Sequence, residues 1–172
     1  QDVAGLPDSV IELARFAISN PTSVTGLSAD PPRTTAPHWA DLSFNEDIVD
    51  VLQQTLLDSG IAEINVKVMV HPKSTPSSLS EFRLIIRKEP DQGQRSVMFI
   101  RNGITITSVN HSPLRGYSAL VVVQDSELSG FLGDSETPAH TTWKNNSAKY
   151  GQKYKYWNLT IGHVANAASQ IV

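Results

Sequence analysis

Lysines alternate with aromatic residues in one segment near the carboxyl end of the chain. The segment runs from residue 143 to residue 157 and contains no acidic residue. Lysines can neutralise phosphates, and aromatic rings can stack on unpaired bases, so the composition fits single-stranded nucleic acid. The same pattern also fits a lysine-rich surface segment whose rings enter the protein core. The candidate nucleic-acid contacts are Lys144, Lys149, Lys153, Tyr154, Lys155 and Trp157.

A glutamate and a histidine four residues apart, Glu136 and His140, form a second pair with chemical potential. Such side chains serve in general acid–base catalysis, and with His163 they could ligate a metal. Pro138 lies between them and interrupts the regular helix that would place both on one face. We therefore expect hydrogen bonds that hold a loop, and we predict no metal site and no catalytic residue. A small stand-alone enzyme using Glu136 and His140 is the alternative.

Familiar catalytic motifs are absent from the sequence. It contains no Gly-rich phosphate loop, no nucleophile elbow and no zinc helix with paired histidines. Because it has no cysteine, disulfides, zinc–cysteine sites and thiol nucleophiles are excluded. The net charge of -3 does not indicate a globally basic nucleic-acid-binding protein. We expect that the chain by itself is not an enzyme.

Hydrophobic periodicity predicts the elements that must position these residues. Apolar residues at helical spacing predict helices over residues 7–19, 45–59, 126–132 and 159–172. Alternating apolar residues predict strands near 64–70, 82–87, 96–107 and 117–124, the third broken at Asn102-Gly103. The last strand is apolar on both faces, which predicts a central position under helices. This order predicts an α+β fold, with a mainly antiparallel four-stranded sheet flanked by N-terminal and C-terminal helices.

The amino-terminal quarter of the chain differs in composition from the rest. Residues 1–43 combine the first predicted helix with a Pro-rich arm, and residues 44–172 form the predicted α+β core domain. A connection of this length is uncommon inside a compact domain, so it is either a packed arm or a linker. We favour an arm that belongs to one structural unit with the core.

The sequence shows no apolar run of membrane-spanning length and no signal-peptide pattern. We therefore expect a cytoplasmic protein without a membrane partner. The chain starts at Gln1 without a Met and stops at Val172 within an apolar helical pattern. Natural termini more often end in polar residues, so we expect a domain cut from a longer protein.

One further pattern extends over Val97 to Trp143. It consists of Arg101 and Gly103 at the end of a strand, the apolar strand 117–123, and a closing element that contains Glu136, Pro138, His140 and Trp143. This arrangement resembles a segment of large bacterial ATP-binding proteins with a GHKL-type ATPase module, the class that includes gyrase and MutL. Ile104 stands where the pattern of those proteins has Met. In them the segment lies beyond the nucleotide-binding domain, whose motifs are not in this chain.

The resemblance implies a non-catalytic, transducer-like coupling domain. Such a domain relays the nucleotide state of a neighbouring ATPase domain of the same chain to a partner or to nucleic acid. ATP and Mg would bind in that neighbouring domain, so we expect no cofactor in this chain. A transducer lysine reaches the terminal phosphate in related ATPases, and Lys73 is the candidate phosphate contact; Lys67 or Lys88 could serve equally. The implied setting is a protein that acts on nucleic acid or in defence against phage.

Overall fold

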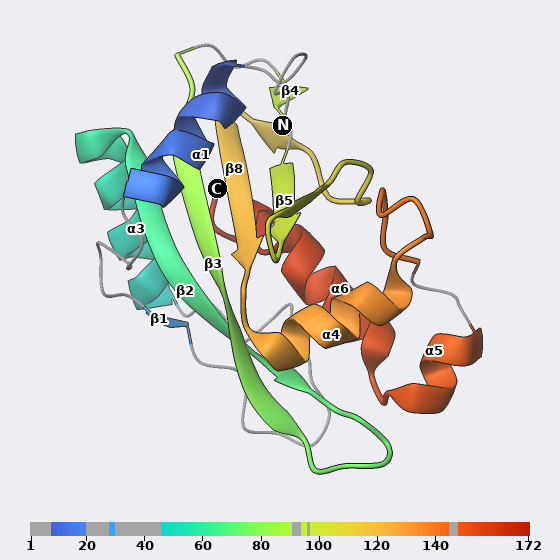
Figure 1. Cartoon of the computed structure of the whole chain (residues 1–172). Helices are drawn as coiled ribbons and strands as arrows, with labels where there is room; N and C mark the ends of the chain where they lie inside the picture. The colour runs from blue at the N-terminus through green and yellow to red at the C-terminus, as the bar shows by residue number, and fades with distance from the viewer. Residues whose placement is uncertain (1–7, 20–27, 30–45, 91–93, 96, 145–147) are drawn as a thin grey trace.

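The computed structural model describes residues 8–19, 28–29, 46–90, 94–95, 97–144 and 148–172. These residues form an α+β fold in which helices cover a mixed sheet (Figure 1), so the predicted fold class is confirmed. The strand order is β1-β2-β3-β8-β5-β6, and β4 and β7 pair separately. The strands are β1 (Ser28–Ala29), β2 (Ile61–Val70), β3 (Ser78–Lys88), β4 (Gln94–Arg95), β5 (Val97–Arg101), β6 (Ile104–Ile106), β7 (Leu114–Arg115) and β8 (Tyr117–Val123).

The main sheet has six strands in the described part of the chain, two more than the four predicted. The pairs β2–β3, β3–β8 and β5–β6 are antiparallel, whereas β1–β2 and β5–β8 are parallel. The expected third strand breaks at Asn102 and Gly103, whose φ angles of 46° and 79° reverse the chain into the β5–β6 hairpin. The β5–β6 hairpin brings the chain back to the end of the sheet where β5 begins, and β8, on the other side of β5, runs parallel to it.

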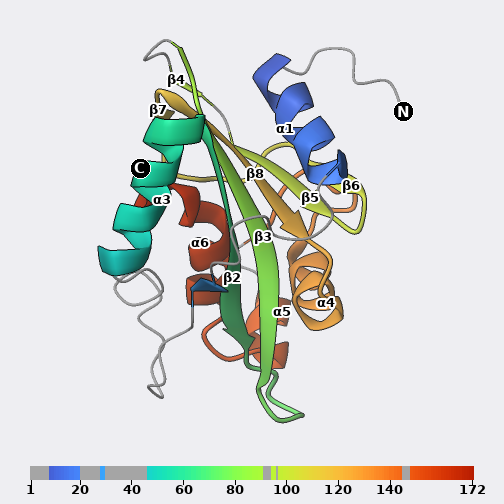
Figure 2. The same cartoon turned by 90° about the vertical axis from the view of Figure 1, so that its left-hand side faces the viewer.

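Helices lie on both faces of the sheet. Figure 2 shows α3 and α6 on one side and α1 on the other. The helix α5 was not predicted, and the predicted C-terminal helix ends early and continues as a short 3-10 turn, η1. The bounds are α1 (Asp8–Ser19), α3 (Glu46–Ser59), α4 (Ser126–Ser135), α5 (Ala148–Lys153), α6 (Trp157–Asn166) and η1 (Ala168–Gln170).

The pleat of the strands divides the buried side chains between two cores. Alternate residues of β2, such as Ile64 and Val66, face the large core together with α3, α4 and α6. The opposite face carries Ile85, Met98 and Leu120, which pack around Leu13 of α1. The strand β8 supplies both cores, as its apolar residues on both faces predicted. This arrangement follows from the two-residue period of a strand.

The amino-terminal and carboxyl-terminal parts of the chain both pack against this sheet. Ser28 and Ala29 in the Pro-rich arm pair with Asn65 and Val66 of β2, while most of the arm lies outside the described residues. At the other end, Gln53 Nε2 of α3 donates a hydrogen bond of 2.8 Å to the carbonyl oxygen of Ile171. Within the described ranges, no helix has the length and apolar character needed to cross a membrane.

Candidate functional site

The residues of the Val97–Trp143 pattern come together around one buried carboxylate. Glu136 follows the C-terminal end of α4, and its side chain is only 1% exposed. Arg101, at the end of β5, donates two hydrogen bonds to this carboxylate. One comes from Nε, and the other comes from Nη2 at 2.8 Å. Trp143 Nε1 donates to the same carboxylate at 3.4 Å, and His140 Nδ1 lies 2.7 Å from it. We call Arg101, Glu136, His140 and Trp143 the Glu136 cluster.

The electrostatics of this cluster favour the ionised carboxylate. Burial by itself would raise the pKa of Glu136, but hydrogen bonds from Arg101, His140 and Trp143, with the Arg101 charge, lower it below its usual value. The hydrogen bond to Glu136 likewise raises the pKa of Arg101, against the opposing effect of burial. A planar guanidinium that meets a carboxylate with two nitrogens gives a strong and directional pair. The cluster therefore stays a fixed ion pair at neutral pH.

The β5–β6 turn and the helix α4 together position the Arg101 side chain for this contact. Asn102 Nδ2 and Arg101 both donate to the hydroxyl of Ser129 in α4, at 2.7 Å and 3.2 Å. A side-chain carbon added to Gly133 would lie 3.4 Å from the Arg101 guanidinium, in ordinary van der Waals contact, so α4 passes directly beside this group. The positive φ of Gly103 lets the hairpin turn directly after Arg101. The predicted break of the third strand at Asn102-Gly103 thus coincides with two residues of positive φ.

The segment between Glu136 and Trp143 closes into a small loop. Glu136 and Trp143 form an isolated antiparallel bridge, and Trp143 packs edge to face on Phe99 with the ring centroids 5.2 Å apart. Pro138 is exposed at the turn, and His140 adopts a φ of 52° with more than half of its side chain exposed. The expected hydrogen bond between Glu136 and His140 is confirmed. This geometry favours holding a loop over acid–base chemistry, because the carboxylate is already bound on several sides.

The described residues contain no group of three or more potential ligands that could hold a metal ion. His163, the third ligand considered above, lies on α6 and is 2% exposed. Its ring packs edge to face against Phe82 with centroids 6.1 Å apart. Burial lowers the pKa of His163 to about 4, so the imidazole is neutral at physiological pH.

The aromatic residues of the lysine-rich segment point into the protein. Tyr150 is 1% exposed and donates a 2.6 Å hydrogen bond to the carbonyl oxygen of Phe131. The ring of Tyr154 packs edge to face on that of Phe131, with the ring centroids 4.9 Å apart. The ring of Trp157 packs edge to face on that of Tyr150, with the centroids 5.5 Å apart. Of the two interpretations left open by the sequence, the structure favours rings that enter the core. The ring of Tyr156, 40% exposed, is the most accessible aromatic group of this segment.

The lysines of the same segment lie at the surface. Lys144, Lys153 and Lys155 are exposed, whereas Lys149 belongs to α5 with its side chain outside the described part of the structure. Lys153 Nζ binds both carboxylate oxygens of Asp134, at 2.9 Å and 3.0 Å. Tyr154 donates to the same carboxylate at 2.8 Å. One of the exposed lysines is therefore already paired.

The β2–β3 loop is fastened to the connection between α5 and α6. The backbone nitrogen of Lys73 donates to the carbonyl oxygen of Lys153, and that of Lys155 donates to the carbonyl oxygen of His71, both at 2.8 Å. Lys73 Nζ adds a 2.6 Å hydrogen bond to the carbonyl oxygen of Gly151. Among the alternatives to Lys73, Lys67 lies within β2, and Lys88 lies at the end of β3 far from this loop. Lys73 also lines a pocket.

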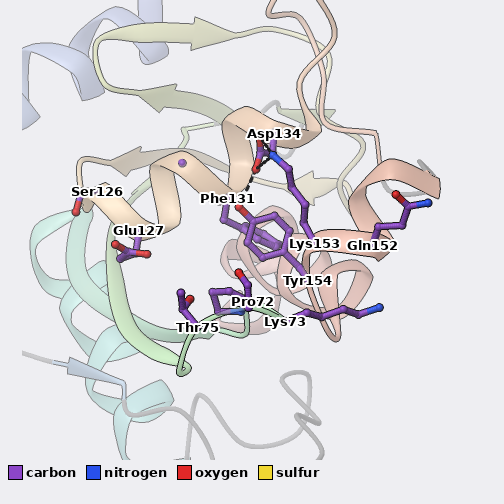
Figure 3. A pocket seen from close by; sticks show the side chains of 12 residues that line it. Pro72, Lys73, Thr75, Ser126, Glu127, Phe131, Asp134, Gln152, Lys153 and Tyr154 are labelled. Carbon is purple, nitrogen blue, oxygen red and sulfur yellow. Dashed lines mark hydrogen bonds and ion pairs between the residues drawn. The ribbon is translucent and has the colours of Figure 1, made fainter.

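This pocket has a volume of about 570 Å³ and lies between the β2–β3 loop, α4 and the end of α5 (Figure 3). Its lining includes Lys73, Lys153 and Tyr154, which the sequence had singled out, and Glu127, Phe131 and Asp134, which it had not. Because three distant segments build the pocket, no local motif could have revealed it. Asp125 caps α4 through a 2.9 Å hydrogen bond from Leu128 N and so fixes where this wall begins.

Comparison with known proteins identifies no relative of this chain. No protein-family model matches the chain, and neither the curated proteins nor the solved structures include a match.

Proposed function

We propose that this chain is a non-catalytic coupling domain of a larger GHKL-type ATPase. The observation that carries the proposal is the Glu136 cluster. Residues from the two ends of the Val97–Trp143 pattern meet there, although Arg101 and Glu136 are 35 positions apart in the sequence. Contact of these side chains with one buried carboxylate supports reading the pattern as one structural unit. The cluster joins the β5–β6 hairpin to the end of α4, so these elements would move as one body.

Rigid joining of this kind suits a domain that relays a change of state. A nucleotide bound in a neighbouring domain would favour one orientation of the coupling domain over another, because the nucleotide binds the two states with different affinity. The domain transmits that bias only if its own helices and strands do not move relative to one another. Lys73, exposed in the β2–β3 loop, remains the candidate contact to the terminal phosphate. Its ammonium group would exchange the carbonyl oxygen of Gly151 for phosphate oxygens.

The test starts from the native polypeptide in source cells, detected and isolated with an antibody to this chain. We expect a protein far heavier than 18.8 kDa that hydrolyses ATP, while the chain alone does not. In the intact protein, Glu136→Gln should leave nucleotide binding in place and reduce the ATP-dependent change in conformation. Glu12→Gln, which removes an exposed ion pair with Arg87, is the matched control. A native protein of 18.8 kDa without ATPase activity would refute the proposal.

A second candidate function is binding of single-stranded nucleic acid, and one observation favours it. The hydrogen bonds between the β2–β3 loop and the α5–α6 connection bring Lys73 close to Lys155, which directly precedes the exposed Tyr156. Backbone phosphates could bind these lysines, and a base could stack on this ring. We expect affinity that falls steeply with salt and is reduced by Lys155→Ala, but not by Lys88→Ala. Affinity that is independent of salt, or equal in both variants, would exclude this function.

A further inference from the structure

The pocket between α4 and the β2–β3 loop has one apolar side and one polar side. Phe131, Tyr154 and Pro72 form the apolar side, and the ring of Phe131 belongs to the large core. Ser126 and Glu127 from the first turn of α4, and Thr75 from the β2–β3 loop, form the other side. Figure 3 shows Glu127 and Thr75 facing the space in front of the Tyr154 ring. A ligand here would therefore meet an aromatic surface and a carboxylate together.

The two lysines that line the pocket do not make it a site for anions. The ammonium of Lys153 is paired with the Asp134 carboxylate, which neutralises both groups. Lys73 Nζ donates to the carbonyl oxygen of Gly151, and in Figure 3 its side chain extends away from the space between Glu127 and Tyr154. In the described residues, the carboxylate of Glu127 forms no hydrogen bond or ion pair. The four charged side chains of the lining balance in sign, and the Glu127 carboxylate is the one that faces the space in front of the Tyr154 ring.

The pKa of the Tyr154 hydroxyl responds to the acidic groups beside it. Burial is the largest cause that raises the pKa of its hydroxyl, and the hydrogen bond to Asp134 adds to it. The charges of Asp134 and Glu127 raise the pKa further, because a tyrosinate would be repelled by both carboxylates. Glu127 thus acts electrostatically on the ring that forms the opposite wall.

We propose that this pocket binds a primary alkylammonium group, the chemistry of a lysine side chain or of a free aliphatic diamine. Glu127 is its counter-ion, and the hydroxyl oxygens of Ser126 and Thr75 accept its remaining hydrogens. The alkyl stem lies against Pro72 and Phe131, and the ammonium group gains a cation–π contact with Tyr154. The amine's proposed partners share no residue with the Glu136 cluster, and Lys73, the candidate phosphate contact, lines the same pocket without being one of them.

The test is a titration of the isotope-labelled chain followed by its amide NMR shifts. The probes are 1,5-diaminopentane and N-acetyl-lysine methylamide, and the neutral control is 1,5-pentanediol. We expect both amines to shift resonances of residues 126–131 and 72–75, and the diol to shift neither set. Tighter binding of the lysine derivative would identify a protein side chain as the natural ligand, and tighter binding of the diamine would identify a free amine.

The variants separate this site from general attraction to an acidic protein. Glu127→Gln keeps the shape of the wall and should weaken amine binding about threefold or more, as expected for one partly exposed charge pair. Glu46→Gln removes an exposed acidic residue from the first turn of α3 and should leave binding unchanged. Equal binding by the diol, an equal effect of both variants, or shifts confined to other parts of the chain would overturn the proposal. The unchanged spectrum of each free variant verifies that it folds.

Discussion

The guanidinium of Arg101 holds the carboxylate of Glu136 with two of its nitrogens, across 35 positions of sequence. The side chains are only 12% and 1% exposed, respectively, so the pair is shielded from water and salt. An exposed pair of the same chemistry joins Arg87 to Glu12, whose side chains are 30% and 54% exposed. The molecule therefore contains its own comparison between a buried and an exposed ion pair.

Glu136→Gln should lower the free energy of unfolding by about 3 kcal/mol, because it leaves the Arg101 charge buried without its counter-ion. Glu12→Gln should cost less than about 1 kcal/mol, as exposed ion pairs do. Chemical denaturation followed by tryptophan fluorescence measures both changes. Equal losses in the two variants would mean that burial of the Arg101 pair has no energetic consequence.

Tyr150→Phe should destabilise the protein by about 1–3 kcal/mol, since the buried carbonyl oxygen of Phe131 loses its hydrogen-bond donor. Tyr154→Phe should cost less, because its hydroxyl is only partly buried and Asp134 keeps its ion pair with Lys153. Thermal unfolding monitored by circular dichroism compares the two variants directly. A larger loss for Tyr154→Phe would contradict the assignment of Tyr150 to the core.

Stability should fall as the pH drops from about 6.5 toward 4, in the range where His163 titrates. Its pKa is about 4 in the folded protein and near 6.5 in the unfolded chain, so the unfolded state takes up the proton first. The loss should reach about 3 kcal/mol below pH 4.

Denaturation midpoints across this range, compared with those of His163→Gln, isolate the contribution of this histidine. Glu136 adds its own loss at lower pH, because its pKa is depressed in the folded state. His111→Gln removes a histidine that is not fully buried and serves as the control. An unchanged pH dependence in His163→Gln would rule out the buried imidazole as the cause.

Two glycines should respond to alanine in opposite directions. Gly130 lies inside α4 with open space around it, and Gly130→Ala should raise stability by about 0.5–1 kcal/mol through its higher helix propensity. Gly103 also has open space but a φ of 79°, and Gly103→Ala should lower stability by about 1 kcal/mol. Melting temperatures of the two variants test the sign. The same sign for both would show that backbone conformation does not decide the effect.

The sequence was informative wherever a local pattern decides the structure. Alternation in β2 correctly placed Ile64 and Val66 in the core, and the apolar residues on both faces of β8 correctly predicted its central position. Asn102 and Gly103 correctly marked the chain reversal, because these residue types accept positive φ. Glu136 and His140 were expected to hold a loop, and their hydrogen bond confirms that contact.

What depends on distant segments could not be predicted in this way. The parallel pairing of β5 with β8 is set by the path of the chain after β6, which has no signature in either strand. The alternation of lysine and aromatic residues does not say which side faces the core, and only the packing of Phe131 against Tyr150 decides it. The pocket required three segments to meet, so Glu127 carried no signal of its own.

The hydrogen bond from Gln53 to the carbonyl oxygen of Ile171 spans 118 positions and has a consequence for synthesis on the ribosome. The β2–β3 hairpin can form as soon as it leaves the exit tunnel, because its partners are close in sequence. The large core stays open on the α6 side until nearly the whole chain has emerged. Apolar strands such as β2 and β8 therefore lack the cover of α6 until residues 157–166 have emerged, the interval in which a chaperone would have most to shield.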